Sequence, residues 1–386
     1  MNEAEWTRAV VERPDDTELR LVFADWLEER GELGRATFIR QQCALAGLPK
    51  WARGWAEHWQ GRHRDAAVRP ELPEGVRWPS FAFERGFASR LDVVDAEVFL
   101  AHAEEIFARA PITAITFDAR YPPFPLQRLL DRPELRRIRA LKFKLGGFDA
   151  EAIARIDACP HLVSLEKLAF TYGGIDAHGV RALLRSSIAA RVSKLGLRNN
   201  FFVEHGAPLV DAFREAPSLP RLRSLNLESN RIGAAGMVEI LRPLVGLREL
   251  LVHDNPLGDE GAALIAEATT GFQALDLSKI GLQLPGLRAL VTSEHLQTLS
   301  SLRLRTNRLG PRAAKVLAST NAWSALEFLD LGDNDLGDAG LESLLDSALF
   351  ARLPRADVLP RGTRSTAPGI RERALKWYYG RSRAGD

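Results

Sequence analysis

The sequence has little cysteine and almost no net charge. Its 386 residues include two cysteines, Cys43 and Cys159, and its 52 Lys and Arg nearly balance its 50 Asp and Glu, which leaves a formal charge of +2. Two cysteines so far apart match no disulfide framework and no zinc or redox spacing, so we expect buried free thiols in a reducing compartment. A nearly neutral chain is not expected to bind nucleic acid or an acidic membrane through its overall charge.

The sequence also lacks a membrane-spanning run and an export signal. No stretch approaches the about 18 apolar residues that a membrane span needs. The first residues, MNEAEW, are acidic and lead into no apolar segment, unlike a signal peptide. We therefore expect a cytoplasmic protein with no membrane partner.

Catalytic signatures are missing as well. The chain has no P-loop, no G-x-G-x-x-G after a strand, no G-x-S-x-G and no metal-ligand cluster. His253, Asp276 and Ser278 could suggest a hydrolase trio, but polar residues are expected at these positions on the solvent face of a sheet. We predict that the protein is not an enzyme and needs no cofactor or metal.

What the sequence does contain is a repeated unit, clearest in residues 247–274. Its apolar residues Leu247, Leu250, Val252 and Leu257, with Asn255 between the last two, follow the spacing L-x-x-L-x-L-x-x-N-x-L. Leu250 and Val252 are two residues apart, so on a strand both side chains point to one face. The following LGDEGAALIAEA predicts an amphipathic helix. One unit is therefore a strand, a turn and a helix.

The unit recurs along the chain every 25 to 30 residues. The residues equivalent to Leu250, here called register residues, are Ile115, Leu141, Leu168, Leu195, Leu225, Leu250, Leu275, Leu302 and Leu329. Five residues further on, the repeats carry Asn200, Asn230, Asn255, Asn307 and Asn334, with Gly146, Gly173 and Ile280 in the others. We expect a ladder of asparagine side chains that satisfies the backbone of the stacked turns.

The strand, the Asn turn and the L-G-D-E-G-A helix start resemble the ribonuclease-inhibitor-like subclass of leucine-rich repeats. The resemblance implies an α/β solenoid, a horseshoe with parallel strands inside and helices outside. We place it at residues 81–360, with FAFERGFASRLDV as its first strand and PRADVL as a degenerate last turn.

The N-terminal part is predicted to be helical over residues 1–67. Asn2 and Glu5 form a capping-box pattern, and Thr17 is expected to cap the second helix. The stretch RPDDTELRLVFADWLEERGELGRATFIRQQ resembles the bacterial repeat-companion domain, although it departs from that pattern at Thr37 and Gln41. The resemblance implies a bacterial protein and no known chemistry for this part.

Two further segments complete the predicted organisation. Residues 68–80 form a proline-rich connector, and Trp51, Trp55 and Trp59 before it share a helical stripe that we interpret as core rather than as an aromatic platform. Residues 361–386 are basic and aromatic. An amphipathic helix that caps the solenoid is the favoured interpretation, and a nucleic-acid-binding tail is the alternative.

The predicted function follows from strand alternation. Residues one and three positions after a register residue should face the concave side. Their charges form a basic first zone, then an acidic and polar middle around Glu228 and Asp276, then a short basic band at Arg303 and Arg305. The residues are Lys142, Lys144, Arg198, Asn226, Glu228, His253, Asp276, Ser278, Arg303, Arg305 and Asp330. We predict that a monomeric chain binds a protein or peptide there, because banded charge orients a complementary partner. The family resemblance also allows a regulator, an inhibitor or activator of another enzyme such as a small GTPase.

Overall fold

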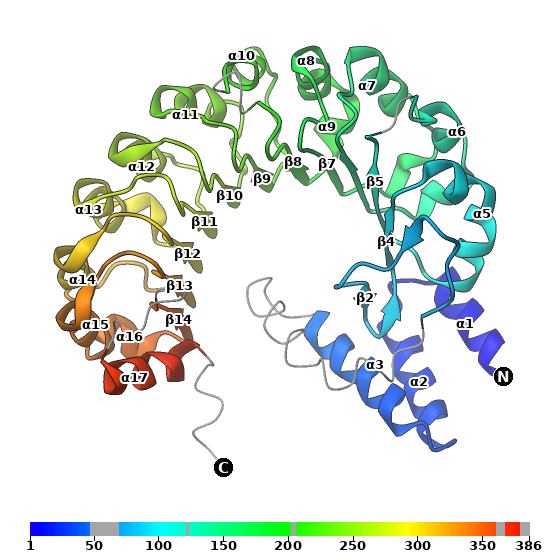
Figure 1. The fold of residues 1–386 in the computed structure, drawn as a ribbon, viewed down its shortest axis with the longest axis horizontal. Coiled ribbons are helices and arrows are strands. Elements are labelled where there is room, and N and C mark those ends of the chain that lie inside the picture. Colours follow the sequence, from blue (N-terminus) through cyan, green and yellow to red (C-terminus); the bar gives the residue numbers. More distant parts are fainter. Residues whose placement is uncertain (47–68, 121–122, 202–205, 360–366, 379–386) are drawn as a thin grey trace. The chain divides into compact units, whose positions relative to one another are not determined.

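The computed structural model describes residues 1–46, 69–120, 123–201, 206–359 and 367–378 (Figure 1). The chain folds into two compact units. Unit 1 comprises residues 1–147 and 154–170, and unit 2 comprises residues 148–153 and 171–386. The predicted tryptophan stripe lies outside the described residues. Within the described part, no helix combines the length and the apolar character needed to cross a membrane.

Unit 1 begins with three helices, α1 (Glu3–Glu12), α2 (Thr17–Glu28) and α3 (Leu33–Ala46). The predicted capping box is present, because the Glu5 N–H donates to Asn2 Oδ1 at 3.0 Å and the Asn2 N–H donates to Glu5 Oε2 at 2.9 Å. The expected cap at Thr17 is wrong by one residue. Asp16 caps α2 by accepting from the Leu19 N–H at 2.9 Å, and its negative charge is favourable at a helix N-terminus.

The expected strand FAFERGFASRLDV is divided into a hairpin and a strand. β2 (Phe83–Glu84) and β3 (Phe87–Ala88) pair antiparallel, and β4 (Arg90–Val93) follows. Arg85 and Gly86 between them both have positive φ, 48° and 86°, as a two-residue hairpin turn of the primed type requires. Aromatic contacts join the hairpin to the helices, since the Phe23 and Phe87 rings lie 5.8 Å apart. The expected continuous strand is therefore wrong, because the Arg85–Gly86 turn interrupts it.

The larger sheet of unit 1 has the strand order β1-β4-β5-β6-β7. β1 (Val76–Arg77) lies in the predicted connector and pairs antiparallel with β4, whereas β5 (Ala114–Asp118) and β6 (Ala140–Lys144) continue in parallel. β7 is Lys167–Thr171. The other helical elements up to residue 170 are α5 (Ala96–Arg109), α6 (Leu126–Leu130), η2 (Pro133–Arg137), α7 (Ala150–Asp157) and η3 (Leu162–Ser164).

Unit 2 repeats one strand and its helices along a parallel sheet. Its strands are β8 (Lys194–Gly196), β9 (Ser224–Asn226), β10 (Glu249–Leu251), β11 (Ala274–Asp276), β12 (Ser301–Arg303), β13 (Phe328–Asp330) and β14 (Arg355–Asp357). They lie in chain order, and each register residue is paired with the next, up to Leu329 with Ala356. The predicted register and the degenerate last turn are confirmed.

Helices line the outer side of unit 2, and the strands line its inner side (Figure 1). The helical elements are α8 (Ala177–Arg185), α9 (Ser187–Arg191), α10 (Ala207–Arg214), α11 (Ala234–Leu241), α12 (Gly258–Glu267), α13 (Leu284–Thr292), η4 (Glu294–Leu296), α14 (Gly310–Ala318), α15 (Gly337–Leu345) and α16 (Ala348–Arg352). The register residues form the core between the two layers, and Leu250 and Val252 are fully buried. The α/β solenoid prediction is confirmed.

The asparagine ladder is present in unit 2. Asn255 is 1% exposed, and its Oδ1 accepts from the N–H groups of Asn230 at 3.2 Å and Ile232 at 2.9 Å. Its Nδ2 donates to the carbonyls of Leu227 at 3.0 Å and Val252 at 2.9 Å. Each ladder amide thus bonds backbone groups in its own repeat and in the preceding one, and it fixes the stacking of the turns.

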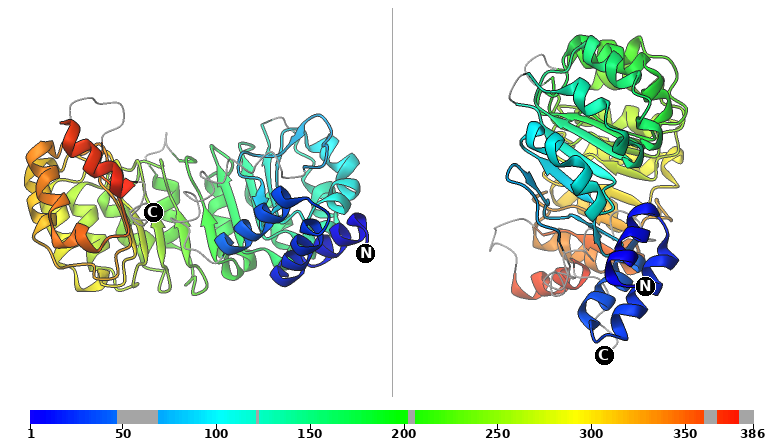
Figure 2. Two further views of the ribbon diagram at one scale, coloured as in Figure 1. Left: turned by 90° about the horizontal axis from the view of Figure 1, so that it is seen from below. Right: turned by 90° about the vertical axis from the view of Figure 1, so that its right-hand side faces the viewer.

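The last described helix, α17 (Pro368–Tyr378), packs against β14 and α15 at the C-terminal end of unit 2 (Figure 2). Ile370 and Ala374 are buried, and Arg373 forms an ion pair with Asp346. Residues 360–366 and 379–386, which hold much of the basic stretch, lie outside the described part. The nucleic-acid alternative for the tail therefore stays a prediction.

Candidate functional site

The candidate site is the strand-lined face of unit 2, defined here as the side chains one position before, one after and three after each register residue. Strand alternation turns these side chains away from the helices. Nine of the predicted site residues lie on this face, and they are Arg198, Asn226, Glu228, His253, Asp276, Ser278, Arg303, Arg305 and Asp330. Lys142 and Lys144 are half-buried on β6 and belong to unit 1.

Several of the predicted binding residues hold the ends of their own strands. In four repeats, the residue after the register position accepts a hydrogen bond from the N–H two residues further on. The four pairs are Asn226 with Glu228 at 3.0 Å, Asp276 with Ser278 at 3.1 Å, Asp330 with Gly332 at 3.0 Å and Asp357 with Leu359 at 3.3 Å. Short Asn and Asp side chains commonly form such turns. These carboxylate and amide oxygens therefore have a structural role as well as a place on the face.

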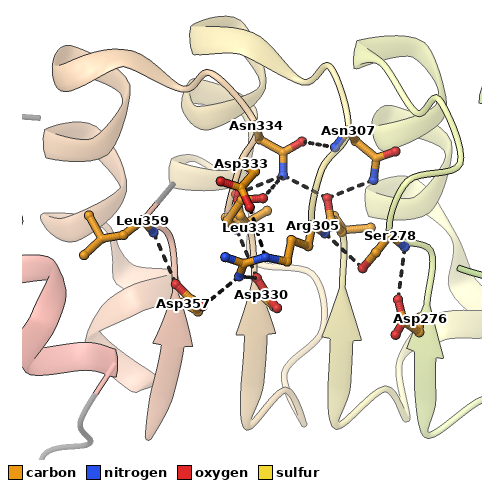
Figure 3. Close-up of polar contacts among 12 residues, drawn as sticks. Asp276, Ser278, Arg305, Asn307, Asp330, Leu331, Asp333, Asn334, Asp357 and Leu359 are labelled. Carbon is orange, nitrogen blue, oxygen red and sulfur yellow. Dashed lines mark hydrogen bonds and ion pairs between the residues drawn. The ribbon is translucent and has the colours of Figure 1, made fainter. Parts of the chain in front are cut away.

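Arg305 lies at the centre of an ion-pair network that crosses three strands (Figure 3). Its Nη1 lies 3.1 Å from Asp330 Oδ1 and 2.8 Å from Asp357 Oδ2, and its Nε lies 3.1 Å from Asp333 Oδ2. The Arg305 side chain is only 11% exposed. The expected basic band at Arg303 and Arg305 therefore needs correction, because three carboxylates already neutralise Arg305. Asp357 is not among the predicted site residues, although it follows Ala356, the last register position.

Two members of the network, Asp330 and Arg305, have shifted pKa values. Burial raises the pKa of Asp330 to about 6, the negative charge of Asp357 adds to the increase, and Arg305 opposes it. Burial alone would lower the pKa of Arg305, but the carboxylates of Asp330 and Asp357 raise it above its usual value. Three carboxylates share one guanidinium, and Asp330 is the most deeply buried of them, so part of its charge is uncompensated.

A second group on the face was missed from the sequence. Phe328 lies one position before a register residue, and the guanidinium carbons of Arg303 and Arg355 lie 5.3 and 5.5 Å from its ring centroid. Such cation–π contacts cover the ring, which is 7% exposed. The predicted site includes only positions after each register residue, although strand alternation places the preceding position on the same face.

Charges at the β8 and β9 end of the face also pair with each other. The Arg198 Nε lies 3.3 Å from Glu228 Oε2, and its guanidinium carbon lies 5.6 Å from the Tyr172 ring centroid. Arg198 belongs to the predicted basic first zone and Glu228 to the predicted acidic middle. The two residues form an ion pair, so the bands are coupled across adjacent repeats.

His253, Asp276 and Ser278 do not form a hydrolase arrangement. Ser278 is 3% exposed, and its Oγ accepts from the Arg305 N–H at 3.1 Å. Asp276 is engaged with the Ser278 N–H, and no hydrogen bond in the described part of the chain joins His253 to either residue. The described residues also contain no group of three or more His, Cys, Asp or Glu placed to hold a metal ion.

Comparisons with known proteins agree with this architecture. A family model described as leucine-rich repeat matches residues 219–241 and 325–345. Ribonuclease inhibitor of Sus scrofa is 31% identical over 196 residues, and that of Mus musculus is 29% identical over 197 residues. Each match covers 41% of this chain and 43% of the relative, so the chain spans less than half the length of these curated relatives. Over the matched residues, the chain is thus similar to leucine-rich repeats and to ribonuclease inhibitor.

Two solved structures are similar at a coarser level. A crystal structure of the Rad7 and Elc1 complex in yeast aligns with a TM-score of 0.46 and 13% identity, covering 94% of this chain and 90% of that chain. A crystal structure of the TLR13–ssRNA13 complex aligns with a TM-score of 0.34 and 16% identity, covering 70% of this chain and 43% of that chain.

Proposed function

We propose that the protein is a non-catalytic scaffold that binds a protein or peptide on the strand-lined face of unit 2. The observation that carries this proposal is the group of Arg303, Phe328 and Arg355 on β12, β13 and β14. Arginine and aromatic side chains are enriched among the residues that dominate binding energy at protein interfaces. The hydrophobic core does not require two arginines on this ring, because Leu302, Leu329 and Ala356 fill the interior of these repeats.

The charges around Phe328 suggest the kind of partner. Arg303 and Arg355 place two positive charges over the ring, whereas Arg305 and its three carboxylates leave a net negative charge beside them. A partner with an acidic group opposite Phe328 and a basic group opposite Asp330 would match both signs. Such complementarity fixes orientation and raises the association rate.

Site-specific photocrosslinking tests this proposal. A photoreactive amino acid at His253, half-buried on the strand-lined face, is compared with one at Val238, which is 50% exposed on α11 of the helical side. In extracts of the native host, we expect a discrete protein adduct from position 253 and none from position 238. Adducts confined to position 238, or no adduct from 253, would refute the assigned face.

An enzyme-inhibiting role is a second candidate. The observation that favours it is the similarity to ribonuclease inhibitor over 41% of the chain. A stoichiometric loss of activity when the intact chain is mixed with a ribonuclease would support it, and an unchanged rate at excess chain would exclude that target. Regulation of a small GTPase rests only on the family resemblance.

We further propose that the chain acts as a cytoplasmic monomer in a bacterium, with its first residues forming the companion domain. In support, Cys43 and Cys159 are both free and buried, as expected in a reducing compartment. Lys142 and Lys144 remain proposed contacts of unit 1, and residues 361–386 remain the proposed alternative site for nucleic acid.

A further inference from the structure

We propose that unit 1 contains a binding site for one small oxyanion of the phosphate class, formed by Arg20, Arg85 and Arg139. The three arginines line one pocket together with Asp15 and Glu84. They come from α2, from the β2–β3 turn and from the residue before β6. Three segments distant in sequence thus bring three arginines and two carboxylates together in the lining, and a third carboxylate, Glu166, lies 3.8 Å from Arg139 Nη1.

Arg20 is the buried member of this group, with 2% of its residue surface exposed. Its Nη1 donates to the carbonyl oxygens of Asp16 at 3.1 Å and Arg13 at 3.5 Å, and its guanidinium carbon lies 5.4 Å from the Phe87 ring centroid. The Nε–H is also buried, and no described residue accepts a hydrogen bond from it. An unsatisfied buried donor lowers the stability of the fold by about 1–3 kcal/mol. A bound acceptor at this N–H would remove that cost.

Arg85 presents a second donor of the same kind. Its Nε is buried without an acceptor among the described residues. Its Nη1 lies 3.7 Å from Asp15 Oδ1 and 3.6 Å from Glu84 Oε1, which are ion-pair distances rather than good hydrogen bonds. Burial and the charge of Arg85 lower the pKa of Arg20 to about 10. The two guanidinium groups therefore repel each other, and an anion between them would relieve the repulsion.

The donor set matches an oxyanion better than a halide. Guanidinium groups present planar pairs of N–H donors whose spacing fits the oxygens of phosphate or carboxylate. A tetrahedral oxyanion can accept from several arginines at once, whereas one carboxylate has only two oxygens to share. As it stands, the pocket has room for about one water molecule. An oxyanion would therefore have to displace the Asp15 carboxylate to enter, and a bulky ester would not fit.

Asp15 is the internal competitor of such an ion. Its carboxylate pairs with both Arg85 and Arg139, and its side chain is 46% exposed on the loop between α1 and α2. An incoming oxyanion would take the place of this carboxylate between the arginines. Removal of the Asp15 charge should consequently strengthen oxyanion binding, an effect opposite in sign to that of removing an arginine.

Calorimetric titration of the full chain with inorganic phosphate, at constant ionic strength maintained with chloride, tests the site. We expect saturable 1:1 binding that Arg85→Gln weakens at least about tenfold and Asp15→Asn strengthens. Arg40→Gln is the matched control. Arg40 lies on α3 of the same unit and pairs with Asp25 and Glu28, and its loss should leave phosphate affinity unchanged.

The expected increase in phosphate affinity of Asp15→Asn tests the proposal even if Arg85→Gln folds poorly. Absence of saturable binding would overturn the proposal, as would equal losses in Arg85→Gln and Arg40→Gln or no gain in Asp15→Asn. Phenyl phosphate should bind more weakly than phosphate. Equal or tighter binding of this ester would contradict a site for the small free ion.

Discussion

At the scale of single residues, Arg305 lies on the predicted binding face but forms ion pairs with Asp330, Asp333 and Asp357. Its side chain therefore has a structural role. Arg305 lies across the backbone of Gly332, where an added Cβ would come within 2.4 Å of its Nη1. Glycine at this position thus makes room for the guanidinium beside Asp330 and Asp357. The positions of Asp330 and Asp357 on their strands were predictable from the register. The burial that couples their charges to Arg305 depends on three strands packed together, so the sequence did not predict it.

The raised pKa of Asp330 predicts a specific pH dependence. A carboxyl whose pKa is raised to about 6 on folding binds its proton more tightly in the folded state than in the unfolded chain, where its pKa is about 3.9. Its contribution to the free energy of unfolding therefore becomes less favourable as pH rises from about 4 to about 6, by up to about 3 kcal/mol. At neutral pH the buried charge destabilises the fold.

The variant Asp330→Asn tests this directly. Asparagine keeps an oxygen that can accept from the Gly332 N–H but removes one of the three charges that share Arg305. In urea unfolding at pH 7.5, we expect the variant to be at least as stable as the wild type. At pH 4.5 the free energy of unfolding of the wild type should be higher, relative to that of the variant, than it is at pH 7.5. A difference between the two proteins that is independent of pH would contradict the shifted pKa.

At the scale of elements, the turn after each strand of unit 2 from β8 to β13 contains a residue with left-handed backbone geometry. The sequence did not predict this conformation. The residue four positions after the register residue has φ between 54° and 59° in Asn199, Ser229, Asp254, Lys279, Thr306 and Asp333. Asparagine, aspartate and glycine tolerate this region well, whereas lysine and threonine do not favour it. Because these side chains share no chemistry, the strained position is visible only in the structure.

Thr306 offers a test of this strain, since it is exposed and β-branched at φ 56°. At this position Thr306→Gly should be more stable than Thr306→Ala by about 1 kcal/mol, because glycine adopts positive φ freely. At exposed Lys315 in α14 the order should reverse, with Lys315→Gly less stable than Lys315→Ala by about 1 kcal/mol. Chemical denaturation of the four variants gives both differences. The same sign at both positions would show that the turn is not strained.

At the scale of the whole molecule, the features that recur with the repeat period could be predicted from the sequence. The features that depend on a single local turn could not. The recurrence from Ile115 to Leu329 sufficed for the parallel strands, the helical layer and the asparagine ladder, because each repeat buries the same positions. The hairpin at Arg85 and Gly86 has no equivalent in the described residues of the repeats, so the repeat period carried no information about it. The group around Phe328 was missed for a simpler reason, because one of the three positions on the face was left out.

The assignment of function to the strand-lined face is the central claim, and Arg303 allows the most direct measurement. The affinity of the crosslinked partner, once purified, is measured at low salt for the wild type, for Arg303→Glu on that face and for Arg288→Glu, exposed on the helical side at α13. Circular dichroism confirms that both variants are folded. We predict that Arg303→Glu weakens binding at least about tenfold and that Arg288→Glu changes it by less than about twofold. Wild-type affinity in Arg303→Glu together with a large loss in Arg288→Glu would contradict the account and move the binding site to the helices.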